Sequence, residues 1–139
     1  MSRRKAKSGR LSVFKGREAR LNKAIFHVLA LKSPQTVYEI SKEVKAQRGL
    51  KHTKYTNINR RVKVLEQYGY IKKVGTRKTQ AGFQASLYQL SARAYLAILL
   101  NRVNLDNLIQ KTSEESILAI LATLVSEMLV FEVSSINHS

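Results

Sequence analysis

Asn57 and Arg60 stand three residues apart in the segment "NINRRVKVLEQYGYIKK", residues 57–73, and both carry side chains that can recognise base edges. An arginine makes paired hydrogen bonds with guanine in the major groove, and an asparagine makes them with adenine. Ile58, Val62 and Leu65 follow i, i+4, i+7 spacing, which predicts a helix with these three side chains buried. At about 100° per residue, Arg60 then lies opposite the apolar stripe and Asn57 flanks it. The spacing predicts a rigid helix that presents a polar face to an anionic partner.

A second group of side chains suits phosphate groups. Contacts to phosphate position a protein on nucleic acid without reading its sequence. Some of these residues lie on or next to the same helix, some in a hairpin that follows it, and some near the N-terminus. They are Thr53, Lys54, Thr56, Arg61 and Lys63, then Arg77, Lys78 and Gln80, and then Arg3, Arg4, Lys5 and Lys7.

The charge of the chain is large and unevenly distributed. The 139 residues carry a net charge of +16, and residues 1–90 hold 22 Lys/Arg against 4 Asp/Glu. Residues 91–139 hold 3 Lys/Arg against 5 Asp/Glu. A basic excess often only keeps a surface solvated, but segregation at this density favours a polyanionic partner for the first part of the chain.

Other chemistries find little support. The chain has no cysteine, and its three histidines, His27, His52 and His138, lack metal-ligand spacing. We expect no cofactor, no metal, no catalytic residue and no enzymatic activity. The most apolar run, Ile117 to Val133, contains Glu127 and Glu132, so we expect no membrane span. These features fit a cytoplasmic, nucleoid-associated protein.

Periodicity and capping signals place the elements around these residues. Helices are expected at about 17–31, from the Thr36-x-x-Glu39 capping box onward, and at 54–68 with a stop at Gly69. Two strands, near Ile71 and at 85–90, are expected to flank a long polar hairpin at 75–84. Further helices are expected after Ser91 and from Ser113, with a shorter one between them. The core face after Ser91 is expected to contain Ala94, Tyr95, Ile98 and Leu99, and most of the six tyrosines are expected in the core.

This order of elements carries a family resemblance. The segment "INRRVKVLEQYGYIKKV", the hairpin and "LYQLSARA" resemble the recognition helix, wing and following helix of prokaryotic winged helix-turn-helix transcription regulators of the MarR and PadR type, most closely the small archaeal ones. The resemblance covers about residues 17–101. It implies an α+β, mainly α fold: a winged helix-turn-helix domain with a two-stranded wing and an added C-terminal helix. It also implies that helix 54–68 enters the major groove of double-stranded DNA, while wing 75–84 meets the backbone or the minor groove.

We therefore expect three regions: a flexible basic arm at 1–16, the DNA-binding domain at 17–101, and a helical segment at 102–139. The last segment has a wide apolar stripe that cannot be left in water. We expect a homodimer formed through Ile117, Leu118, Leu121, Leu124, Val125 and Met128.

Two alternatives to a dimeric transcription regulator remain open. One is an architectural, chromatin-type protein that uses the same fold with little sequence specificity. The other is an RNA-binding winged helix. The basic arm favours both alternatives, whereas Asn57 and Arg60 favour the sequence-specific regulator. The sequence identifies neither an operator nor a small-molecule effector.

Overall fold

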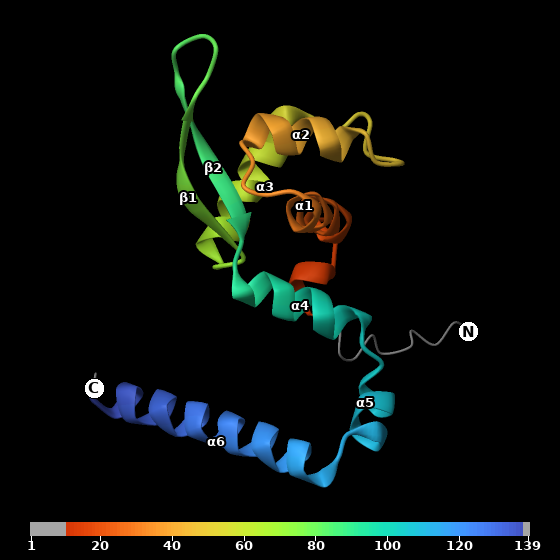
Figure 1. The fold of residues 1–139 in the computed structure, drawn as a ribbon, viewed down its shortest axis with the longest axis vertical. Coiled ribbons are helices and arrows are strands. Elements are labelled where there is room, and N and C mark those ends of the chain that lie inside the picture. The colour runs from red at the N-terminus through yellow and green to blue at the C-terminus, as the bar shows by residue number, and fades with distance from the viewer. Residues whose placement is uncertain (1–10, 138–139) are drawn as a thin grey trace. The chain divides into compact units, whose positions relative to one another are not determined.

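The computed structural model describes residues 11–137 (Figure 1). The chain divides into two compact units, the first ending at Arg102 and the second beginning at Val103. Its elements, in chain order, are η1 (Ser12–Phe14), α1 (Ala19–Leu31), α2 (Val37–Lys45), α3 (Tyr55–Gln67), β1 (Ile71–Lys78), β2 (Gln84–Leu90), α4 (Ala92–Arg102), α5 (Leu105–Lys111) and α6 (Glu114–Asn137). The first unit is a winged helix-turn-helix, and added helices follow it, so the expected fold class is confirmed.

The core of the first unit is built from one apolar stripe of each of the first three helices. Ile58, Val62 and Leu65 of α3 are fully buried, as their spacing predicts. Ile25 and Leu29 of α1 are also fully buried, and α1 contacts both α2 and α3. The buried stripe of α3 fixes the rotation of this helix about its axis, and so decides which side chains of α3 reach the surface.

Both ends of the helix-turn-helix are capped as expected. The Thr36 side chain accepts a hydrogen bond from the Glu39 backbone, while the Glu39 carboxylate accepts one from the Thr36 backbone, which forms the predicted capping box. At the end of α3, Gly69 has φ +82°. The Tyr70 N–H donates to the Leu65 carbonyl and the Gly69 N–H to the Glu66 carbonyl. This is a Schellman ending, which needs the left-handed conformation that glycine adopts without strain.

The wing is a two-stranded antiparallel sheet, and its strands are longer than expected. Gly75 to Lys78, predicted as part of the loop, pair with Gln84 to Leu87. The register shifts between Lys73 and Gly75, which leaves Val74 as an extra residue in β1. Only Thr79 to Phe83 remain outside the strands, with Gly82 at φ +87°. Backbone hydrogen bonds between Gln35 and Tyr88 attach β2 to the segment that precedes α2.

Part of the expected N-terminal arm belongs to the core. Val13 and Phe14 in η1 are buried, and the Phe14 ring packs edge-to-face on Phe26 with centroids 5.7 Å apart. The Asn22 amide donates a hydrogen bond to the Val13 carbonyl. The expectation of a flexible arm reaching residue 16 is therefore wrong for residues 11–14, whereas Lys15 and Gly16 are exposed. A single turn with two apolar residues has no periodicity that sequence analysis could detect.

The buried face of α4 also differs from the expected one. Ala94 and Ala97 are buried and Ile98 packs against the core, whereas Tyr95 and Leu99 are about half exposed. Because α4 is apolar on most sides, its composition did not indicate which side packs inward.

In the second unit, α5 and α6 follow the expected positions, with α6 starting directly after Ser113. The apolar side chains along α6 are exposed: Leu118, Leu121, Leu124, Val125 and Met128 are each between 51% and 63% accessible. Ile117 is half-buried. Within residues 11–137, no helix is both long enough and apolar enough to cross a membrane.

Candidate nucleic-acid interface

The exposed face of α3 presents Asn57 and Arg60 side by side. Both side chains are exposed, and Arg60 Nη2 donates a hydrogen bond of 2.6 Å to Asn57 Oδ1. Both project away from the fully buried side of the helix, because Ile58 and Val62 anchor it. The structure thus brings together the two residues that sequence analysis assigned to base recognition.

The N-terminal end of α3 adds hydrogen-bond donors to this face. Lys54 occupies the N-cap position without a side-chain cap, and its carbonyl accepts the Asn57 and Ile58 N–H groups, so the N–H groups of Tyr55 and Thr56 meet no capping side chain. Lys54 and Thr56 are exposed and Thr53 is half-buried. Free N–H groups at the positive end of a helix dipole attract an anion such as phosphate.

Lys63 lies on the same face but is held by the wing. Its Nζ donates a hydrogen bond of 2.6 Å to the Tyr88 hydroxyl and lies 5.2 Å from the centre of the Tyr88 ring. The hydrogen bond to Tyr88 raises the pKa of Lys63. Tyr88 itself is buried in β2. Lys63 therefore joins α3 to the base of the wing while its ammonium stays charged.

Arg61 points elsewhere. It is half-buried, and its Nη2 lies 3.6 Å from Oε1 of Glu18 at the start of α1. Together with Asn22 and Tyr70 it lines a cavity between η1, α1 and the end of α3. One residue along a helix is a rotation of about 100°, which explains why Arg60 and Arg61 face different surroundings.

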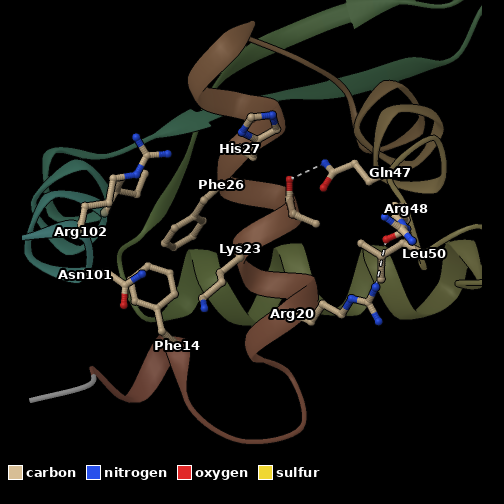
Figure 2. A pocket seen from close by; sticks show the side chains of 12 residues that line it. Phe14, Arg20, Lys23, Phe26, His27, Gln47, Arg48, Leu50, Asn101 and Arg102 are labelled. Carbon is tan, nitrogen blue, oxygen red and sulfur yellow. Dashed lines mark hydrogen bonds between the residues drawn. The ribbon is translucent and has the colours of Figure 1, made fainter. Parts of the chain in front are cut away.

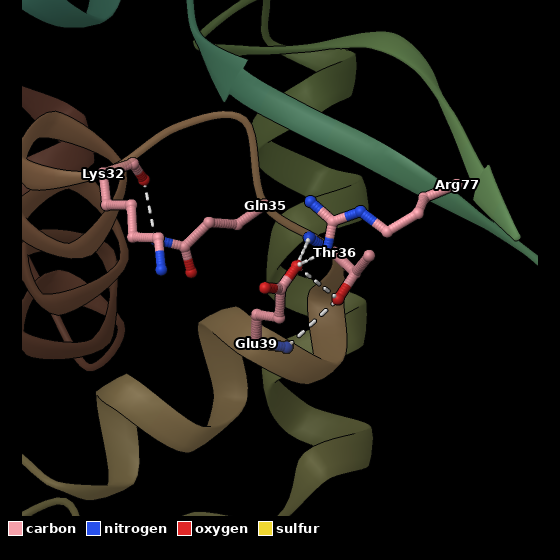
Figure 3. A network of polar contacts seen from close by, with 5 residues as sticks. All are labelled: Lys32, Gln35, Thr36, Glu39 and Arg77. Carbon is pink, nitrogen blue, oxygen red and sulfur yellow. Dashed lines mark hydrogen bonds and ion pairs between the residues drawn. The ribbon is translucent and has the colours of Figure 1, made fainter. Parts of the chain in front are cut away.

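On the wing, Arg77 contacts α2 (Figure 3). Its Nη1 donates to Glu39 Oε1 at 2.8 Å, and the same oxygen accepts the Thr36 N–H at 3.0 Å and the Thr36 hydroxyl at 3.2 Å. These contacts, with the Thr36 backbone bond first, lower the pKa of Glu39. The capping box of α2 thus also anchors the wing. No sequence pattern predicts this contact, because the two residues are 38 positions apart.

The other wing residues are free to meet a partner. Lys78 and Gln80 are exposed at the far end of the hairpin. The Thr79 N–H donates to the Phe83 carbonyl, and the Gly82 N–H donates to the Thr79 carbonyl, which closes a three-residue loop. Arg3, Arg4, Lys5 and Lys7 lie outside the described residues.

Several tyrosines expected in the core are at the surface. Tyr38 of α2 and Tyr68 after α3 are both 64% exposed, while Tyr55 and Tyr95 are exposed to a smaller extent. Lys42 lies over the Tyr38 ring at 5.8 Å. Tyr38 falls beside the stripe of Val37, Ile40 and Val44 rather than on it, which was a usable signal. Among the described residues, no group of three or more His, Asp or Glu side chains is placed to hold a metal ion.

Comparisons with known proteins give structural likenesses only. No family model matches the chain. No curated protein sequence matches it either. The diamide-treated YodB of B. subtilis is 18% identical over 74% of this chain and 88% of its own, with a TM-score of 0.49. TA0346 of Thermoplasma acidophilum, described as a candidate transcriptional regulator, is 18% identical over 66% of this chain and 94% of its own, with a TM-score of 0.44.

FabT of Streptococcus pneumoniae, solved in complex with DNA, is 19% identical over 88% of this chain and 84% of its own, with a TM-score of 0.42. At these identities and TM-scores, none of the three likenesses decides what this chain binds.

Proposed function

We propose that this protein is a double-stranded DNA-binding transcriptional regulator that reads the major groove with α3. One observation carries the proposal: α3 is anchored by a fully buried stripe and presents Asn57 and Arg60, hydrogen-bonded to each other, on its exposed face. The major groove of B-DNA admits an α-helix, and these two side chain types make the paired base contacts that distinguish guanine and adenine.

The residues around Asn57 and Arg60 supply the phosphate contacts. Lys54, Thr56 and the free N–H groups at the start of α3 bind backbone oxygens, and the half-buried Thr53 hydroxyl adds to them. Lys63 uses one of its three donors on Tyr88 and keeps two for phosphate. Arg61 lies beside Glu18, whose carboxylate offsets its positive charge, so in this proposal it contributes less to phosphate binding than Lys54 and Lys63.

The wing reaches the backbone or the minor groove with Lys78 and Gln80, which are exposed at its far end. Arg77 has a different part in the proposal. Its bond to Glu39 fixes the angle of the wing against α2, so the wing meets DNA in a defined position. By sequence, Arg3, Arg4, Lys5 and Lys7 add positive charge for backbone contact.

The second unit makes the protein a homodimer. Leu118, Leu121 and Leu124 are exposed, with Val125 and Met128 on the same side of α6. An apolar stripe of this width on a surface marks a contact with another protein. The acids at the start of α6 and the low charge of residues 91–139 do not suit DNA, whereas a second copy presents the same apolar stripe.

Selection of bound sequences from a random duplex pool tests the proposal. A dimeric regulator enriches a palindrome whose half-sites are about 10–10.5 base pairs apart, or a multiple of that. Binding to all duplexes without enrichment overturns the regulator in favour of an architectural protein, which the charge of residues 1–90 also suits. Tighter binding of RNA than of every DNA duplex overturns both the regulator and the architectural protein.

A further inference from the structure

The tip of the wing exposes an aromatic side chain. Phe83, the last residue of the loop between β1 and β2, is 72% exposed. Phe14 and Phe26 are placed in the opposite way: they are 2% and 1% exposed, and their rings pack edge-to-face (Figure 2). A ring that stays in water when the chain folds adds little to the stability of the fold. Phe83 is therefore free for a partner.

The backbone holds Phe83 in a defined position. The Thr79 N–H donates to the Phe83 carbonyl at 2.7 Å, and the Phe83 N–H donates to the Thr79 hydroxyl oxygen at 3.2 Å. Gly82 has φ +87°, and a Cβ added to it would meet no atom within 4 Å. The glycine thus serves the turn that presents Phe83, and not packing. A group that is held in place before binding loses less entropy when it binds.

The wing tip also has a fixed position relative to α3. In Figure 1 the hairpin extends beyond the helices of the first unit. At its base, Lys63 of α3 bonds to the Tyr88 hydroxyl. Farther along, Arg77 bonds to Glu39 of α2. A duplex held against α3 therefore meets the wing tip at a set distance from the bases that α3 contacts.

The surroundings of Phe83 are cationic and rich in amides. Residues 71–90 contain four Lys or Arg and no Asp or Glu. Lys78, Gln80 and Gln84 are exposed around the loop. A single ring among polar side chains lacks the contiguous apolar patch that marks a contact with another protein. Proteins that bind the minor groove combine these residue types: Lys and Gln contact the groove, and a Phe enters between two base pairs.

We propose that Phe83 is a wedge that enters a base step from the minor groove and kinks the duplex beside the bases read by α3. The wedge rests on the proposed DNA binding of α3 and adds to it a selection for deformable DNA. TA and CA/TG steps unstack most easily, so the wedge favours them where the wing tip meets the groove. This preference arises at a position that neither Asn57 nor Arg60 contacts.

The fluorescence of 2-aminopurine, an adenine analogue that brightens when it is unstacked, tests the wedge. It replaces one adenine at a time in the duplex enriched by the random-pool selection, or in a duplex of repeated TA steps if none is enriched. When the full chain saturates the duplex, we expect a rise of about twofold or more beside the site, as unstacking requires. Phe83→Ala should lose most of this rise. Phe83→Leu should keep most of it, because leucine also acts as a wedge.

Two variants serve as controls. Leu31→Ala removes an apolar side chain that is 73% exposed at the end of α1, so it should leave the fluorescence unchanged. Lys78→Met removes a charge beside the loop, so it should weaken binding but keep the rise once the duplex is saturated. Thermal unfolding of Phe83→Ala should match that of the wild type, because the ring is exposed.

Duplex binding by the wild type without a rise at any position overturns the wedge and leaves the regulator standing. The same rise with Phe83→Ala does so too. Failure of the wild type to bind any duplex overturns both. If Phe83→Ala loses binding to phosphatidylglycerol vesicles while its duplex signals match those of the wild type, the wing tip contacts lipid, and the wedge is overturned.

Discussion

Arg60 donates a hydrogen bond of 2.6 Å to Asn57, and this bond is the starting point for the base recognition that we propose. A base that pairs with either side chain has to replace or share that bond. The two residues are also preorganised, because their mutual bond restricts the rotamers of two exposed side chains and lowers the entropy lost on binding. We expect their contributions to specificity to be coupled.

Arg60→Ala should cost about 1–3 kcal/mol of binding free energy on a selected site and relax preference at one base step. The fold should persist, because Arg60 lies opposite Ile58, Val62 and Leu65. Competition binding with single-base variants of the site measures both effects. Arg60→Lys is the control, since it keeps the charge but loses the planar fork. If Arg60→Ala weakens all duplexes equally, Arg60 contacts phosphate rather than a base.

Glu39 gives the folded protein a pH-dependent contact. Its pKa is lowered, first by the Thr36 backbone hydrogen bond and then by its other contacts with Thr36 and Arg77. A carboxyl with a lowered folded pKa stabilises the fold above its unfolded pKa, near 4.5. This stabilisation is fully present at pH 6 and is lost as the pH falls below about 4.5 and through the lowered folded pKa.

Glu39→Gln should keep the capping box, which accepts glutamine, and lose the charge. We expect the variant to be about 0.5 kcal/mol less stable than the wild type at pH 6, since the carboxylate is partly exposed. The difference should shrink as the pH falls from 6 to below 4.5, because the carboxylate of the wild type becomes protonated. Urea unfolding of both proteins across this pH range measures it. A difference that stays constant as the pH falls means that packing, and not charge, accounts for the loss.

At the scale of elements, the helices were predictable and their long-range contacts were not. The stripe of Ile58, Val62 and Leu65 and the box of Thr36 and Glu39 are local patterns, and both are confirmed. Residues 75–78 were assigned to a loop because they are polar, and a ladder of backbone hydrogen bonds leaves no trace in side chain type.

Of the proposed DNA contacts, the polar face of α3 follows from helical spacing alone. The ion pairs of Arg61 with Glu18 and of Arg77 with Glu39 join residues 43 and 38 positions apart, and no periodicity connects them. Whether a basic side chain of this domain is paired with a carboxylate depends on which residues the fold brings close to it, and not on its residue type.

The link between α2 and the wing predicts that Arg77 and Lys78 act differently. Arg77→Met should weaken duplex binding by freeing the wing, and Glu39→Gln should weaken it through the same contact. The double variant should therefore lose less than the sum of the two. Lys78→Met should lose one phosphate contact, and its loss of binding free energy should add fully to that of Glu39→Gln. Two double-mutant cycles test this, from the binding free energies of the wild type, the three single variants and the two double variants that contain Glu39→Gln. Full additivity of Arg77→Met with Glu39→Gln makes Arg77 a direct DNA contact instead.

At the scale of the whole molecule, charge and apolar surface divide between the two units. The first unit has the basic surface, and the second has the exposed apolar stripe of α6. If a dimer neutralises about eight phosphates, the plot of log K against log salt should have a slope of about −7. Filter binding at several salt concentrations gives the slope. A slope shallower than about −3 for the full chain means that most of the charge faces solvent.

Deleting residues 1–10 should make the slope shallower than that of the full chain and leave the preferred sequence unchanged.

Leu121→Asp tests the proposed dimer through α6. Leu121 is half exposed in the isolated chain, in the middle of the stripe that Leu118, Leu124 and Val125 continue. In a helix–helix contact the new carboxylate would be buried without a partner, which costs several kcal/mol. We expect the variant to run as a monomer by light scattering and to lose affinity for a palindromic duplex, although its DNA-facing residues are unchanged. Ala119→Asp places the same charge about 160° around α6 from the stripe, so it should remain dimeric and bind normally. A Leu121→Asp protein that stays dimeric shows that the two copies meet elsewhere.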